Sequence, residues 1–199
     1  MKIIGITGRS GCGKSSVTRL IAAKGYPCID ADAVAREVLE PGSPCIKQLQ
    51  NVFGSDIVDG SGTVQRRLLA DRAFATPEGT ACLTAITHPE ILHRIDQRLQ
   101  QARESGSQLA FVDGAVIVGT PFADRCDRLV VVTAPYEESV ARICARDGIV
   151  PDMARRRLDA QTPEQTLLEH ADFVLENNDT SQRLQERALD LLHRLEQEP

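Results

Sequence analysis

The feature that most constrains this chain is a glycine-rich segment that lies between an apolar run and a helical pattern. Residues 8–15 read G-R-S-G-C-G-K-S, which fits the pattern G-x-x-x-x-G-K-[ST]. The apolar run at residues 2–6 predicts a strand before the segment, and apolar residues recur at helical spacing from Lys14 until Gly25. A strand, a glycine loop and a helix in this order predict a loop that binds the phosphates of ATP or GTP.

Each residue type in this loop has a chemical role in binding phosphates. Glycines allow the backbone N–H groups to turn inward as an anion-binding nest, and the amino end of the helix adds roughly half a positive charge. Lys14 can reach the β- and γ-phosphates, and the Ser15 hydroxyl can hold Mg²⁺. A chance glycine turn with a solvated lysine is the alternative, but it leaves the flanking strand and helix unexplained. The expected nucleotide contacts are Gly8, Gly11, Cys12, Gly13, Lys14, Ser15 and Ser16.

The rest of the chain alternates strand and helix patterns. Further strands are predicted at residues 26–29, 109–112, 129–133 and 173–175. Helices are predicted, among other places, at residues 66–74, 77–86, 89–102 and around 184–195. Strands that alternate with helices predict a three-layer α/β/α sandwich with a mainly parallel sheet, whose ligands bind at the carboxyl ends of the strands.

Length and composition limit the class of protein. The chain has 199 residues, 42% of them hydrophobic and 26% charged, which suits one globular domain with a buried core. Aromatic residues make up only 4% and the formal net charge is -5, so a nucleic-acid-binding surface is not expected. No apolar run is long enough to span a membrane, and the first strand begins without a signal peptide. We therefore expect a cytoplasmic protein whose six scattered cysteines are buried thiols and not metal ligands.

Other classes of nucleotide-binding protein need second motifs that are missing here. A switch GTPase needs D-x-x-G after an apolar strand, and residues 59–62 match only as letters because no such strand precedes them. It also needs a guanine-reading N-K-x-D, which Asn177-Asn178-Asp179 does not match, so both segments are interpreted as turns. A motor ATPase needs an apolar run that ends in Asp-Glu, and none is present. Transfer of a phosphoryl group to a small acceptor is therefore the leading reaction class.

Such a transfer needs a base for the acceptor hydroxyl and cations for the transition-state charge. Asp30 and Asp32 follow the second predicted strand, at the sheet edge where the phosphate loop is expected. Either can be a base, but Asp30 can instead cap a helix and Asp32 can be a solvated acid in its first turn. Arg142 and Arg146 lie one helical turn apart and can point together at phosphates, or they can form a solvated arginine face.

Two further residues are candidates of second rank. Asp113 ends an apolar strand, where it can hold Mg²⁺ through water or take part in a turn. His88 stands directly before Pro89, at the predicted start of a long helix. It can contact a substrate there, or it can cap or pack the helix.

With these residues in view, the chain resembles the dephospho-coenzyme A kinase family nearly end to end. Residues 5–15 match the opening of the family, and D-A-D at residues 30–32 matches its second motif. Further matches follow in order: Arg66 with Leu69 and Phe74, His88-Pro89-Glu90-Ile91, Arg142 with Arg146-Asp147, Arg157 with Gln161, and Ala171-Asp172 with Asn177. The phosphate loop alone is generic, but the ordered set is specific.

The resemblance implies a kinase that uses ATP and Mg²⁺ to phosphorylate the ribose 3′-hydroxyl of dephospho-CoA, the last step of coenzyme A synthesis. It implies that Asp32 is the base and that Lys14 and the arginines Arg142 and Arg146 stabilise the transferring phosphoryl group. The substrate contacts implied in the same way are Asp32, Arg66, His88 and Gln161, with Ser15 as the metal ligand. We expect dephospho-CoA as a small-molecule substrate, no nucleic-acid or membrane partner, and a monomer.

The resemblance also implies how the single kinase domain is divided. The core is expected at residues 1–54, 107–141 and 171–199. A helical insertion that binds the substrate is expected at residues 55–106, and an arginine-rich lid at residues 142–165.

The chain departs from the family pattern in three places. Arg9 stands where the loop usually has a second glycine, and Leu167 stands where Lys or Arg is common. Residues 113–119 read D-G-A-V-I-V-G in place of D-x-P-L-L-x-E, which removes a proline and a glutamate. These departures keep two alternatives open: a kinase for another small hydroxyl or nucleotide acceptor, and a nucleotide-binding regulatory protein without turnover.

Overall fold

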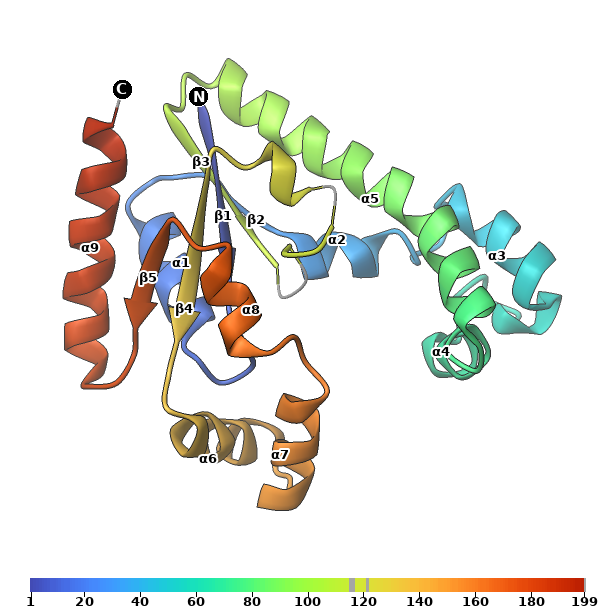
Figure 1. The fold of residues 1–199 in the computed structure, drawn as a ribbon. Helices are drawn as coiled ribbons and strands as arrows, with labels where there is room; N and C mark the ends of the chain where they lie inside the picture. The colour runs from blue at the N-terminus through green and yellow to red at the C-terminus, as the bar shows by residue number, and fades with distance from the viewer. Residues whose placement is uncertain (115–116, 121, 199) are drawn as a thin grey trace. The chain divides into compact units, whose positions relative to one another are not determined.

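The computed structural model describes residues 1–114, 117–120 and 122–198. Within these residues the chain forms a parallel sheet of five strands in the order β2-β3-β1-β4-β5 (Figure 1). The strands are β1 (Lys2–Thr7), β2 (Cys28–Asp30), β3 (Leu109–Asp113), β4 (Arg128–Thr133) and β5 (Phe173–Glu176). Every strand that the apolar runs predict is therefore present, and the three-layer α/β/α fold is confirmed.

Helices connect the strands and cover the sheet. They are α1 (Lys14–Ala23), α2 (Ala31–Glu37), α3 (Cys45–Phe53), α4 (Arg66–Ala73), α5 (Pro77–Glu104), α6 (Tyr136–Asp147), α7 (Pro151–Asp159), α8 (Glu164–Glu169) and α9 (Ser181–Gln197), with 3-10 turns η1 (Ser55–Ile57) and η2 (Ala123–Arg125). Val17 of α1 and Leu184 of α9 share one buried cluster with Ile4 and Ile6 of the central strand β1. Burial of these aliphatic side chains between helix and sheet is the main source of stability for such a fold.

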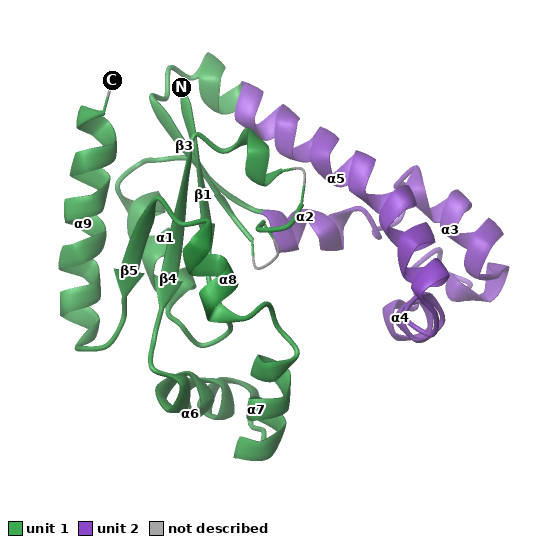
Figure 2. Ribbon diagram, in the orientation of Figure 1, with its two compact units in different colours: residues 1–30, 101–199 green, residues 31–100 purple. Residues whose placement is uncertain are grey.

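The chain forms two compact units, which Figure 2 distinguishes by colour. The sheet unit consists of residues 1–30 and 101–199 and contains every strand of the sheet. The helical unit consists of residues 31–100 and has a core of its own. That core is formed by Val38, Cys45, Leu49, Phe53, Ile57, Val64, Leu69 and Ala73.

Helix α5 differs from the sequence-based expectation. Two helices were predicted, with a break at His88-Pro89, but one helix runs from Pro77 to Glu104 with Pro89 inside it. Proline has no N–H to donate within the helix and usually breaks it or bends it. Ile86 and Ile91 on either side of Pro89 both pack against the core of the helical unit, and this packing outweighs the lost hydrogen bond.

Two further expectations concern turns and membrane spans. The segment at residues 59–62 is a turn as predicted, because the Asp59 carboxylate accepts hydrogen bonds from the backbone N–H groups of Ser61 and Thr63. In the described part of the chain, no helix has both the length and the apolar character that crossing a membrane requires. The departure from the family pattern at residues 113–119 falls partly on residues 115 and 116, which lie outside the described residues.

Candidate active site

The phosphate loop lies where the sequence predicts it, between β1 and α1 at the carboxyl end of the central strand. Two neighbouring strands end at the same edge of the sheet. The register pairs Ile6 with Asp113 at the end of β3, and Asp113 with Asp30 at the end of β2. Parallel strands therefore bring the loop and these two acidic residues to one edge, where α/β proteins bind their ligands.

Two glycines of the loop cannot be replaced without strain. Gly11 has φ +80°, and a Cβ there would lie 2.5 Å from the carbonyl oxygen of Ser139. Gly13 has φ +100°, and its Cβ would lie 2.4 Å from Nδ2 of Asn177. Both backbone angles lie in the left-handed region, which side chains other than glycine rarely adopt. The loop thus packs its backbone directly against the start of α6 and the segment after β5.

Two side chains from the second half of the chain hold the loop backbone in place. The Gln161 side chain accepts a hydrogen bond from the Ser10 backbone N–H at 2.9 Å and donates one to the Ser10 hydroxyl at 2.8 Å. The Asn177 amide donates to the Cys12 carbonyl at 2.8 Å and is only 7% exposed. Sequence reasoning noted Asn177 only as part of a turn and of a family motif, and it expected Gln161 at the substrate. In the structure both side chains support the loop.

Cys12 occupies the middle of the loop but is not a nucleophile. Its side chain is 2% exposed, and burial raises the pKa of its thiol, although Lys14 acts in the opposite direction. A thiol with a raised pKa stays protonated and unreactive at neutral pH. Cys12 therefore packs under the loop. The prediction that the scattered cysteines are buried holds for Cys12 and Cys45, but Cys28, Cys126 and Cys144 are only partly buried and Cys82 is exposed.

Lys14 forms an ion pair with Asp113. Its ammonium group donates a hydrogen bond to the Asp113 carboxylate, and the two side chains are only 17% and 13% exposed. The sequence placed Asp113 in the second rank because a carboxylate at a strand end can simply take part in a turn. The parallel register pairs Asp113 with Ile6 of β1, the strand that leads into the phosphate loop, and this register brings Asp113 to the candidate site.

The two candidate arginines of α6 have different partners. Arg142 donates to the carbonyl oxygen of Gly11 in the phosphate loop at 3.2 Å, and also to Glu138 at 2.7 Å. Arg146 instead makes two hydrogen bonds to Asp147, at 2.7 and 2.9 Å, and Arg157 of α7 reaches the same carboxylate at 2.6 Å. Together the two guanidinium groups lower the pKa of Asp147. Arg142 is thus the arginine of this pair that reaches the loop.

Three predicted site residues belong to the helical unit. Asp32 lies in the first turn of α2, two residues after the end of β2, and is partly buried. Arg66 begins α4 and donates to the Arg36 carbonyl at 3.2 Å. His88 is a partly buried residue inside α5, not the residue before a new helix.

The loop region has the donor atoms that Mg²⁺ prefers. Among the described residues no group of three or more His, Cys, Asp or Glu side chains is arranged to hold a metal. A kinase does not need such a group, because Mg²⁺ uses one or two protein oxygens together with phosphates and water. Ser15 at the start of α1 and the Asp113 carboxylate at the end of β3 are oxygen donors of this kind.

Comparisons with known proteins show which family this chain belongs to. The family model described as dephospho-CoA kinase matches residues 2–183. The chain belongs to the dephospho-CoA kinase family. The dephospho-CoA kinase of Corynebacterium glutamicum is 39% identical over 189 residues, which cover 95% of this chain and 94% of that protein. The dephospho-CoA kinase of Corynebacterium jeikeium is 41% identical, with 94% of this chain and 96% of that protein covered.

Solved structures give the same picture. The crystal structure of TT1252 from Thermus thermophilus is 34% identical, has a TM-score of 0.82, and covers 100% of this chain and 98% of its own. A shikimate kinase from Acinetobacter baumannii shares the fold alone, at 16% identity and a TM-score of 0.55, with 100% of this chain and 96% of that one covered. This dephospho-CoA kinase family member is a kinase that uses ATP, and its reaction is the final step of coenzyme A synthesis. The alternatives of another acceptor or a regulatory role are not favoured.

Proposed function

We propose that the sheet unit holds ATP on the phosphate loop and that the helical unit receives dephospho-CoA. The observation that carries this proposal is the fixed loop with Lys14 paired to Asp113 at the carboxyl edge of the sheet. Asp32 follows the strand β2, which ends at that same edge, by two residues. The chain therefore supplies three components that phosphoryl transfer requires, namely a phosphate-binding loop, a cation and a candidate base.

The transfer itself needs little covalent chemistry from the protein. In the proposed reaction the ribose 3′-oxygen forms a bond to the γ-phosphorus, while the bond from that phosphorus to the β–γ bridging oxygen breaks and ADP leaves. The Asp32 carboxylate accepts the proton of the 3′-hydroxyl. Lys14 moves from Asp113 to the phosphate oxygens and neutralises charge that develops there.

Mg²⁺ fits the donors at this edge. The Ser15 hydroxyl would hold the ion, and the Asp113 carboxylate would support it directly or through water. When bound, the ion neutralises charge on the β- and γ-phosphates. When the Lys14 ammonium group moves to the phosphates, the Asp113 carboxylate would become available to support the ion.

The remaining predicted site residues take supporting roles in the proposal. Residues 142–165 act as the lid, in which Arg142 stabilises the transferring phosphoryl group because it already reaches the loop carbonyl of Gly11. Arg146 joins it once it leaves Asp147. Arg66 and His88 contact dephospho-CoA, and Arg66 binds a phosphate group, since its side chain is 47% exposed and a guanidinium matches the geometry of phosphate.

A coupled assay of ADP release tests the proposal. We expect ADP release that depends on both Mg²⁺ and dephospho-CoA, with CoA identified as the product by mass spectrometry. Turnover of several small hydroxyl compounds without turnover of dephospho-CoA would instead support a kinase for another acceptor. Tight ATP binding without transfer to any acceptor would support a regulatory protein.

A further inference from the structure

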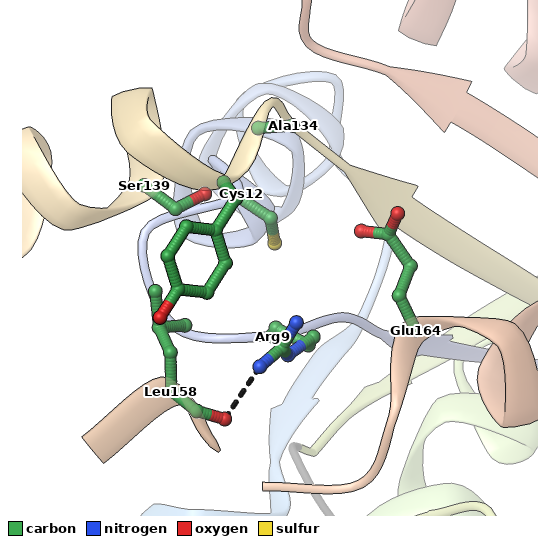
Figure 3. A pocket seen from close by; sticks show the side chains of 7 residues that line it. Arg9, Cys12, Ala134, Ser139, Leu158 and Glu164 are labelled. Carbon is green, nitrogen blue, oxygen red and sulfur yellow. Dashed lines mark hydrogen bonds between the residues drawn. The ribbon is translucent and has the colours of Figure 1, made fainter. Parts of the chain in front are cut away.

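The side chain of Arg9 leaves the phosphate loop and reaches the carboxyl end of α7. Its Nη2 donates a hydrogen bond to the Leu158 carbonyl oxygen at 2.5 Å, the contact drawn as a dashed line in Figure 3. This carbonyl lies in the last turn of α7, where the helix dipole is negative. A guanidinium is favourable at such a position because it provides both a donor and a positive charge.

A second contact ties the same guanidinium to α6. The Arg9 Cζ lies 5.9 Å from the centroid of the Tyr136 ring, within the range of a cation–π interaction. The Tyr136 hydroxyl donates to Asp159 at 2.9 Å, so the first residue of α6 is also bonded to the last residue of α7. Arg9 therefore touches the junction at which the two helices meet.

The arginine is held for its position and not for a ligand of its own. The cavity beside it, lined also by Cys12, Ser139 and Glu164, has a volume of only about 50 Å³ (Figure 3). That volume holds one or a few water molecules and no substrate. Nε of Arg9 is buried and makes no hydrogen bond within the described part of the chain. Such a group is costly to bury, which argues for a contact that the fold needs.

A second link joins the end of α7 to Ser10, the loop residue that follows Arg9. The Leu158 carbonyl that accepts from Arg9 also accepts from the backbone N–H of Gln161 at 3.0 Å. Gln161 in turn holds both the backbone N–H and the hydroxyl of Ser10. Residues 9 and 10 of the loop and residues 158 and 161 after α7 thus form one connected network of hydrogen bonds.

Packing connects α7 to α6, the helix that carries Arg142. Leu158 and Ala154 of α7 share a buried cluster with Val140 and Ile143 of α6. Arg142 lies between Val140 and Ile143 in the sequence of α6, and its guanidinium contacts the Gly11 carbonyl. The two helices that Arg9 contacts therefore pack together, and one of them carries the guanidinium that contacts the loop at Gly11.

We propose that Arg9 is a positioning residue that couples the phosphate loop to helices α6 and α7. It acts through the Leu158 carbonyl and the Tyr136 ring, so that occupation of the loop by nucleotide is transmitted to α7. The coupling deepens the proposed function and rests on it, because it assumes that ATP binds this loop.

The test compares Arg9→Met, which keeps the aliphatic stem, with Arg9→Lys, which keeps the charge. Hydrogen exchange of the α7 amides is measured on the full chain with and without a non-hydrolysable ATP analogue. In the wild type we expect the analogue to slow exchange in α7 about tenfold or more. In Arg9→Met this slowing falls to less than about threefold, and Arg9→Lys restores part of it. Arg183→Met on α9, which removes an exposed pair with Glu186, is the matched control and behaves like the wild type.

Steady-state kinetics provide the readout that a merely structural role would not move. We expect Arg9→Met to raise KM for ATP about tenfold, the usual scale for loss of a charge-assisted hydrogen bond, while KM for dephospho-CoA stays within twofold. Normal slowing of α7 exchange and a normal KM for ATP in Arg9→Met would overturn the coupling. A lowered melting temperature of Arg9→Met, with α7 exchange and KM for ATP unchanged, would also overturn the coupling. Failure of the wild-type chain to bind the analogue at all would instead overturn the proposed function.

Discussion

The sheet unit and the helical unit hold their candidate residues in different ways. In the sheet unit, buried or partly buried side chains from distant segments fix the loop backbone, with Asn177 on Cys12 and Gln161 on Ser10. In the helical unit, Arg66 is 47% exposed, and its polar partners are the Arg36 carbonyl and, at 3.8 Å, Glu40. In the proposed function, the nucleotide side of the reaction is therefore preorganised by the fold, and the acceptor side relies on individual side chains.

This difference suits the two proposed substrates. The triphosphate of ATP is compact and highly charged, and it binds best to fixed dipoles that do not need to reorganise. Dephospho-CoA is long and flexible, and exposed side chains can adjust to it. Changes in the sheet unit should therefore act mainly on ATP binding and transfer, and changes in the helical unit mainly on the acceptor.

The largest effect is expected at Lys14. Replacement Lys14→Met removes the cation proposed to neutralise the transferring phosphoryl group, so turnover should fall about 10³-fold, with a higher KM for ATP. Steady-state ADP release measures both quantities. Lys24→Met, at the other end of α1, is the matched control and should behave as the wild type. A loss of less than threefold in Lys14→Met would remove this residue from the mechanism.

Asp32 is expected to show the next largest effect, because this residue of the helical unit is the proposed base of the transfer step. Asp32→Asn cannot accept the proton of the 3′-hydroxyl, so turnover should fall by roughly 10² or more. The dissociation constant for ATP, measured by calorimetry, should stay within about twofold. Asp30→Asn should retain most of the turnover. If Asp30→Asn loses more turnover than Asp32→Asn, the assignment of the base is reversed.

A smaller effect is expected when the support of the loop is removed. Asn177→Ala leaves the Cys12 carbonyl without its buried donor, which costs about 1–3 kcal/mol of stability and should raise KM for ATP about tenfold. Thermal unfolding measures the loss of stability, and steady-state kinetics measure KM for ATP. Asn178→Ala, whose side chain pairs on the surface with Glu176 and Arg187, is the control. An unchanged KM for ATP would mean that the loop keeps its shape without this contact.

Arg66 tests the other unit directly. Arg66→Gln removes a guanidinium proposed to bind a phosphate of the acceptor, so KM for dephospho-CoA should rise about five- to tenfold. KM for ATP should not change, and the exposed neighbour Arg67→Gln should affect neither constant. A rise in KM for ATP in place of the acceptor would break the division of roles between the two units.

The smallest effect concerns alkaline stability. Burial raises the pKa of Cys28 in the sheet unit to about 11, from an ordinary value of 9.0. The unfolded chain therefore releases this thiol proton at a lower pH than the folded chain does. The contribution of the protonated Cys28 thiol to folding stability is complete below pH 9 and is lost as the pH rises towards 11. Cys28→Ala should reduce the fall in melting temperature between pH 8 and 10.5 by about 2–4 °C. Cys82→Ala, at an exposed thiol of the helical unit, should leave the fall unchanged.

Much of this fold and site follows from local patterns in the sequence. The apolar runs predicted each strand of the described sheet within two residues at either end. The spacing of Gly8, Gly13 and Lys14 predicted the loop, because a phosphate cradle needs a particular order of residue types along a few neighbouring positions. The continuous helix α5 was missed, since the breaking tendency of Pro89 is local while the packing that overrides it is not.

Only the tertiary structure decided which distant groups meet at the loop. The partners of Lys14 and Cys12 are separated from them by 99 and 165 residues, and Leu158, the partner of Arg9, by 149. No periodicity connects such positions, because strand order and helix packing bring them together. The sequence by itself therefore determined the class of fold and the kind of ligand that the loop binds. The structure decided which side chains hold the loop, since those contacts depend on the three-dimensional path of the whole chain.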